Sequence, residues 1–223
     1  MPAPFIVMPG LLLFIFPSME EQIDILNPDG SPAGYSCGRT EVHSKGLWHR
    51  TVHIWAFDGT GRVLFQLRSH LKENNPNLLD TSCAGHISAG DTSRNAAVRE
   101  LKEELGVHKN SGDLEYLFEA THESVLNDGT YFDNEYYDTY KITLTDKETG
   151  HLLPQPGEVD DFVWMTVPEF LELNRKHPER FVSHPKDYHC RLGQLDQCSL
   201  DPPHCHRRSK SHASPRCHCG RSR

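Results

Sequence analysis

The sequence lacks any apolar run long enough to cross a bilayer. Its longest apolar run covers residues 11–16, whereas a membrane-spanning helix needs roughly 18 to 20 such residues. The segment that holds this run also lacks the basic start and the small-residue cleavage signal of a secretory signal peptide. These absences exclude an integral membrane protein and predict no membrane partner. For residues 1–18 they predict an unstructured extension, with a weak targeting segment as the alternative.

The sequence also lacks a pattern of paired cysteines. Of its seven cysteines, an odd number, only Cys37 and Cys83 lie before residue 189. A disulfide framework is therefore not expected, and the default is a reducing compartment such as the cytoplasm. The other five cysteines share residues 189–223 with several histidines, but without the Cys-x2-Cys pairs of structural zinc sites. This segment is predicted to be a disordered tail, with an adventitious or regulatory metal-binding tail as the alternative.

Excess positive charge is missing as well. The chain has 23 Lys and Arg against 31 Asp and Glu, a net charge of −8, so no nucleic-acid partner is expected. Residues 189–223 have the opposite balance, with seven basic and two acidic residues. This change in composition predicts a domain boundary there and leaves residues 19–188 as one globular domain. The sequence specifies no oligomeric state.

The middle of the chain alternates β-rich and helical patterns. Residues 93–105 and 168–176 have helical composition, and the first of these helices has Thr92 among its candidate caps and Gly106 as its end. Residues 58–61 form a turn between two strands, as in a hairpin. Together the patterns predict a mixed β-sheet with helices packed on it. The predicted strands cover residues 22–26, 51–57, 62–67, 114–121, 131–144 and 159–167.

The first helix has a concentration of carboxylates. Glu100, Glu103 and Glu104 stand at i, i+3 and i+4, so they share one helical face. The alternative is an ordinary solvated acidic face, which is the commoner outcome for a generic helix. Carboxylates that repel one another are also tolerated around a hard divalent cation such as Mg²⁺, which prefers oxygen ligands.

The spacing around these carboxylates favours the metal hypothesis. Gly85 is followed after five residues by Asp91 and, after seven more, by the sequence RELKEELGV at residues 99–107. This arrangement resembles the Nudix box, and Asp91 is its one departure, standing where the family has Glu. The resemblance implies an α/β/α sandwich with a mixed β-sheet and a catalytic loop-helix-loop. It also implies Mg²⁺-dependent hydrolysis of a diphosphate linkage in a nucleotide, prenyl or related organic diphosphate, with Mn²⁺ as another possible ion.

Specific roles follow from that resemblance. Glu100, Glu103 and Glu104 become metal ligands, one of them a candidate base, and the loop at Gly85 lets the backbone approach the metal. Asp91 is one methylene shorter than Glu, so reduced reach is expected rather than loss of activity.

A second resemblance covers residues 23–164, which are similar to the isopentenyl-diphosphate isomerase-like group of the Nudix superfamily. It is based on Trp48-His49 before a strand, Gly85-His86 at the start of the box and residues 133–135 in a later strand. The metal site of the isomerases uses three histidines and acidic residues, which match His43, His49, His86, Glu104, Asp133 and Glu135. The positions that contact the diphosphate match Arg39, Arg68 and Lys72, and such cations pair with phosphate oxygens.

One departure separates this chain from the isomerases. They need a cysteine immediately before the glycine of Gly-His, where this chain has Ala84. Cys83 lies one residue earlier, and neighbouring side chains of an extended segment point to opposite faces. The sequence therefore favours a hydrolase built on the isomerase-like variant. The alternatives are an isomerase and a catalytically silent diphosphate-binding domain.

Overall fold

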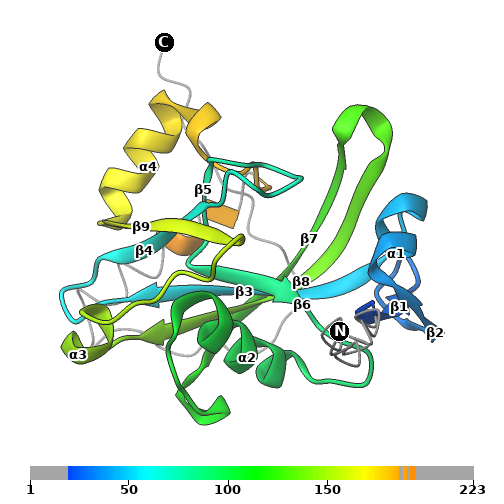
Figure 1. Cartoon of the computed structure of the whole chain (residues 1–223), viewed down its shortest axis with the longest axis horizontal. Coiled ribbons are helices and arrows are strands. Elements are labelled where there is room, and N and C mark those ends of the chain that lie inside the picture. Colours follow the sequence, from blue (N-terminus) through cyan, green and yellow to red (C-terminus); the bar gives the residue numbers. More distant parts are fainter. Residues whose placement is uncertain (1–19, 186–187, 190, 194–223) are drawn as a thin grey trace, which may run out of the picture.

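The computed structural model describes residues 20–185, 188–189 and 191–193 (Figure 1). The predicted extension at 1–18 and nearly all of the predicted tail at 189–223 lie outside the described residues. The strands are β1 (Gln22–Leu26), β2 (Pro32–Gly38), β3 (His49–Phe57), β4 (Val63–Arg68), β5 (Leu79–Asp80), β6 (Cys83–His86), β7 (Glu115–Leu126), β8 (Tyr131–Thr143) and β9 (Val159–Met165). The helices are α1 (Arg39–Lys45), α2 (Ser93–Leu105), α3 (Asp146–Thr149) and α4 (Val167–Lys176), with short 3-10 helices at Ser111–Asp113, Asn127–Gly129 and Pro178–Arg180.

The main sheet is mixed and is organised around β3. Its strand order is β5-β4-β3-β8-β7, with β6 paired to β3 and β9 paired to β4. β3 and β8 run parallel, while β3 and β4 meet as an antiparallel pair only at Phe57 and Val63. Beyond that point the two strands separate, and β6 takes the place beside β3. β1 and β2 form a separate two-stranded sheet.

The two faces of the main sheet carry different cores. On β3, Val52 and Ile54 belong to the cluster that packs against α2, while Trp55 and Phe57 belong to a second cluster that includes Phe170 of α4. This alternation follows the two-residue period of a strand. The sheet therefore lies between α2 and α4, which confirms the predicted α/β/α arrangement (Figure 1). Tyr188 and Leu192 also pack in the second cluster, so the packed chain extends past residue 188.

Helix α2 has clear local signals at both ends. The Thr92 side chain accepts a hydrogen bond from the backbone N–H of Asn95, and Gly106 ends the helix in the left-handed region with φ 70°. The helix docks through Leu101 and Leu105, both fully buried. Glu100 and Glu104 lie on buried positions of the helix, while Lys102 and Glu103 are exposed.

Most predicted elements are confirmed within a few residues, and β1 and α2 have the predicted bounds. β7 is longer than predicted, because pairing with β8 extends it to Leu126. The sequence did not predict β2, α1, β5, β6 or α3. β5 and β6 are only two and four residues long, too short for a periodic pattern, so pairing with longer strands defines them. Among the described helices, none has the length and apolar character needed to cross a membrane.

Candidate metal and diphosphate site

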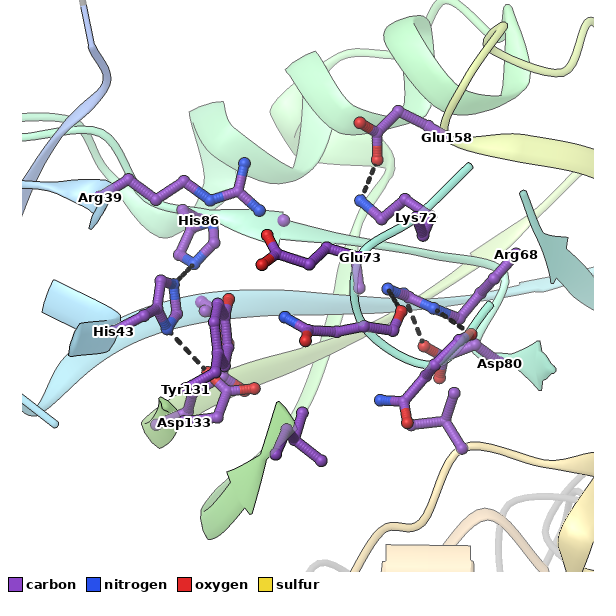
Figure 2. Close-up of a pocket in the computed structure, with 18 of the residues that line it drawn as sticks. Arg39, His43, Arg68, Lys72, Glu73, Asp80, His86, Tyr131, Asp133 and Glu158 are labelled. Carbon is purple, nitrogen blue, oxygen red and sulfur yellow. Dashed lines mark hydrogen bonds and ion pairs between the residues drawn. The ribbon is translucent and has the colours of Figure 1, made fainter. Parts of the chain in front are cut away.

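A polar pocket of about 800 Å³ opens beside β6 and α2 (Figure 2). Side chains from α1, β3, β6, α2, β7 and β8 line it. We refer to Gly85, Glu100, Glu103 and Glu104 as the helix wall. We refer to His43, His49, His86, Asp133 and Glu135 as the histidine wall.

The helix wall depends on a close approach between α2 and β6. A Cβ atom placed on Gly85 would overlap the carboxylate of Glu100, so a larger residue here would push that carboxylate out of its position. Arg99 strengthens the contact, because its guanidinium donates to the backbone oxygen of His86 at 2.8 Å. Glu100 is buried, whereas Glu103 is exposed at the rim, where it pairs with Arg99 at 3.2 Å.

Burial raises the pKa values of the two inner carboxylates, Glu100 and Glu104. It raises the pKa of Glu100 to about 7, against the opposing charge of Arg99. Burial likewise raises the pKa of Glu104 to about 8, and the negative charge of Glu100 adds to the effect. The backbone N–H of Ala84 donates to Glu104 at 3.2 Å. Arg99 pairs with Glu100 at 2.7 Å, whereas Glu104 has no ion pair among the described residues, so the two buried carboxylates together form a site that a cation would stabilise.

The histidine wall brings together three imidazoles from three elements. The Nε2 atoms of His43 and His86 lie 3.0 Å apart, and the ring centroids of His49 and His86 are 5.2 Å apart. A ring nitrogen from each of the three histidines falls within 4.8 Å of the others. The Nδ1–H of His49 donates to the backbone oxygen of Leu47 at 3.0 Å, which leaves Nε2 facing the cluster. Imidazole nitrogens grouped in this way are typical of a metal site.

Two carboxylates of β8 complete this wall. The parallel pairing of β3 with β8 sets Glu135 opposite His49, and the Glu135 carboxylate lies 3.6 Å from His49 Nε2. Asp133 lies 3.4 Å from Nδ1 of His43. Both His49 Nε2 and Asp133 Oδ1 are buried without a hydrogen-bond partner among the described residues. Orphaned buried ligand atoms beside neutralising carboxylates fit a divalent cation.

The lowered pKa of His86 agrees with this interpretation, whereas the pKa of His49 is shifted in the other direction. Burial lowers the pKa of His86 well below its usual value, and the neighbouring charges of His49 and Arg39 lower it further. A neutral imidazole is the form that binds a metal. Burial would also lower the pKa of His49, but the hydrogen bond and charge of Glu135 outweigh it and raise the pKa.

The three predicted diphosphate ligands all line the pocket but differ in their surroundings. Arg39 is exposed at the start of α1 and extends over the pocket near His86 (Figure 2). Lys72 forms an ion pair with Glu158. Arg68 is the most constrained, because it contacts Asp80 at 3.3 Å and donates to the backbone oxygens of residues 74 and 75.

Two departures from the family pattern have clear structural positions. Asp91 accepts hydrogen bonds from Thr92 and Asn95 at the start of α2, so it supports the helix end and does not line the pocket. Cys83 is fully buried in the core, on the opposite face of β6 from Ala84. Burial raises the pKa of the Cys83 thiol well above its usual value. Cys83 therefore does not replace the cysteine that the isomerases have at the position of Ala84.

Sequence reasoning missed several residues of this pocket. Tyr131 stacks on His43 with ring centroids 4.2 Å apart, and His53, Asp80 and His184 line a further part of the cavity. The available signal was the two-residue spacing of polar side chains along β3 and β8, which places them on one face. No comparable sequence signal linked His184 to the site.

Comparisons with known proteins agree with the fold. A family model described as the NUDIX domain matches residues 47–185. More than half of the chain is matched, and the chain belongs to this family.

The relatives include both hydrolases and isomerases. The chain is 39% identical over 183 residues to Nudix hydrolase 3 of Arabidopsis thaliana. The match covers 79% of this chain and 23% of the relative, so this chain spans about a quarter of that protein's length. It is 34% identical over 163 residues to an uncharacterised Nudix hydrolase of Listeria innocua, covering 71% of this chain and 87% of the relative. It is 29% identical over 164 residues to an isopentenyl-diphosphate Delta-isomerase of Serratia proteamaculans, covering 74% and 87%.

Solved structures share the fold at lower identity. The protein DR0079 of Deinococcus radiodurans matches with a TM-score of 0.56 and 21% identity, over 79% of this chain and 98% of that chain. A MutT protein of Methanosarcina mazei matches with a TM-score of 0.51 and 12% identity, over 69% and 96%. At these identities the likeness concerns the fold alone.

Proposed function

We propose that this chain is a Mg²⁺-dependent hydrolase, also able to use Mn²⁺, that cleaves a diphosphate linkage in a small organic diphosphate. The observation that carries the proposal is the pair of buried carboxylates, Glu100 and Glu104, set against the Gly85 backbone in a pocket that cations also line. The absence of a cysteine at Ala84 supports hydrolysis over isomerisation.

The two walls of the pocket have different roles in this proposal. Glu100, Glu103 and Glu104 hold a cation, with Glu104 also the candidate base because it lies deepest and has the most strongly raised pKa. The five residues of the histidine wall hold a second cation or shape the pocket around it. A divalent cation bound here supplies positive charge that neutralises phosphate oxygens and activates water.

Other side chains orient the diphosphate. Arg39, Arg68 and Lys72 face the pocket with positive charge, and charge-assisted hydrogen bonds from such groups hold phosphate oxygens. The contacts of Arg68 to Asp80 and to the loop carbonyls fix its guanidinium before substrate arrives. A preorganised cation loses less entropy when it binds the substrate.

The proposal is tested by measuring phosphate or pyrophosphate release with Mg²⁺ over a panel of nucleoside, sugar and prenyl diphosphates. Wild type is compared with Glu104→Gln, which keeps the size of the side chain. We expect at least one member to turn over and the variant to lose that turnover. Diphosphate binding without turnover of any member would favour the silent binding domain.

A second candidate is isopentenyl-diphosphate isomerisation, and the histidine wall is the observation that favours it. The family resemblance places its five residues at the metal-site positions of the isomerases, with Asp133 in place of Glu, and isomerases are among the relatives. Interconversion of isopentenyl diphosphate and its isomer without phosphate release would establish this function in place of hydrolysis.

We also propose that residues 19–188 contain the complete catalytic domain. A chain limited to these residues should retain the turnover of the full chain. Loss of turnover in a well-folded truncated chain would assign a role to the flanking segments.

A further inference from the structure

A second group of buried polar side chains lines the pocket away from the proposed metal ligands. It comprises His53 of β3, Asp80 of β5 and His184, which follows the last 3-10 helix. His53 lies four residues beyond His49 on the same face of β3, so their backbone positions are about 13 Å apart. The group therefore occupies a separate end of the cavity.

Asp80 organises this end. Its Oδ1 accepts hydrogen bonds from His184 Nε2 at 2.9 Å and from the backbone N–H of Thr81 at 2.7 Å, while Oδ2 contacts Arg68 at 3.3 Å. Burial would raise the pKa of Asp80, but the bond and charge of His184, together with Arg68, lower it instead. The carboxylate is thus ionised, and it holds both partners in place.

His53 has one ring nitrogen available to a ligand. Its Nδ1 pairs with the Tyr188 hydroxyl at 2.9 Å, and its ring stacks on Tyr137 with centroids 4.3 Å apart. Burial lowers the pKa of His53 to about 3, so the ring is neutral. Within the described residues Nε2 has no hydrogen-bond partner, and a neutral imidazole offers one donor or acceptor there.

This end of the pocket is unsuited to a hydrocarbon. Besides the three residues above, polar side chains near this end include Ser183, which precedes His184, and His122 of β7, whose charge acts on His53. A prenyl chain would cover these groups without replacing their hydrogen bonds to water, which is costly. A site built to form hydrogen bonds rejects analogues that lack the matching group.

We propose that His53 and His184, positioned by Asp80, form a specificity subsite that binds a polar organic group of the substrate, such as a sugar or nucleobase, and disfavours a prenyl chain. The inference rests on the proposed function, since it concerns the group attached to the diphosphate. It narrows the substrate class from any organic diphosphate to those with a hydrogen-bonding group.

Binding of three non-hydrolysable probes to the full chain with Mg²⁺ tests this inference by calorimetry. The probes are methylenebisphosphonate, α,β-methylene ADP and the methylene analogue of isopentenyl diphosphate, which share the diphosphate-like core. We expect the ADP analogue to bind at least about 10-fold more tightly than the core alone and than the isopentenyl analogue. Equal or tighter binding of the isopentenyl analogue, or no gain from the ADP moiety, overturns the inference.

Variants assign the preference to the subsite. His53→Phe keeps a ring to stack on Tyr137 and should weaken the ADP analogue about 10-fold with the core probe unchanged. His184→Gln should act in the same direction, and His151→Phe, at an exposed position, should change neither probe. Equal weakening of both probes, or no effect of either subsite variant, contradicts the assignment. Because the probes resist cleavage, that outcome leaves the hydrolase proposal, which is tested by product release, unaffected.

Discussion

The helix wall and the histidine wall face one pocket but are assembled differently. The helix wall comes from one continuous segment, residues 85–104, in which a glycine lets one helix approach one short strand. The histidine wall needs α1, β3, β6 and β8, and the parallel pairing of β3 with β8 sets His49 against Glu135.

The two walls also differ in how far their buried charges are neutralised by neighbouring side chains. Among the described residues, the buried Glu100 and Glu104 share only the ion pair from Arg99 to Glu100, and the pKa of each is raised. In the histidine wall, imidazoles and carboxylates partly neutralise one another, as the 3.4 and 3.6 Å contacts indicate. We therefore expect the helix wall to depend most strongly on a cation and to control turnover. The histidine wall should chiefly set metal affinity.

The largest expected effect is on turnover in the helix wall. Glu104→Gln should lower the rate of product release at least about 100-fold, because it removes a metal ligand and the candidate base. Glu103→Gln is the matched control, since Glu103 is exposed at the rim, and it should lose about 10-fold or less. Initial rates at saturating Mg²⁺ measure both. Equal losses would remove the distinction between inner and rim carboxylates.

A smaller effect is expected from the histidine wall. His49→Ala should weaken Mn²⁺ binding at least about 10-fold, as measured by electron paramagnetic resonance titration. Turnover should fall at limiting metal and recover largely at saturating metal, unlike that of Glu104→Gln. A variant with unchanged Mn²⁺ affinity would show that these histidines only shape the pocket.

The junction between the walls is tested by Gly85→Ala. The added Cβ would overlap the Glu100 carboxylate and displace it. Because this carboxylate ends a flexible side chain, the cost in free energy of unfolding should be at most about 1 kcal/mol, whereas turnover should fall about 10-fold because a proposed metal ligand moves. Gly59→Ala is the control, because a Cβ there meets no atom within 4 Å. Urea unfolding and initial rates of both variants give the comparison. A Gly85 variant with both the stability and the turnover of the control would refute the close approach.

The pH dependence of the metal-free protein tests the raised pKa values of the helix wall directly. The folded pKa values of Glu100 and Glu104, about 7 and 8, lie above the usual 4.5. Their contribution to stability is therefore complete below the unfolded pKa and is lost as pH rises toward 8, by up to about 1.4 kcal/mol per pH unit and group. Unfolding in EDTA at pH 5 and pH 8 should show a smaller loss for Glu104→Gln than for wild type. Identical losses would contradict the raised pKa of Glu104.

The success of the sequence predictions also differs between the helix wall and the histidine wall. α2 was predictable because its cap, its apolar stripe and Gly106 are local signals. The histidine ligands were identified only through family resemblance, since His43 lies on a short helix whose N-cap makes no side-chain hydrogen bond. Asp80 and His184 were not predicted, because a bridge between Leu79 and Phe181 brings these distant segments together. Such long-range pairing leaves no periodic signal in the chain.

The most direct test of the central claim follows phosphorus products by NMR in isotopically labelled water, with Mg²⁺ and the best substrate of the panel. Hydrolysis inserts one oxygen atom from water into the phosphate-containing products. We predict labelled product from the wild type and at least about 100-fold slower labelling with Glu104→Gln. Conversion of isopentenyl diphosphate to its isomer, with no label incorporated from any substrate, would contradict the account.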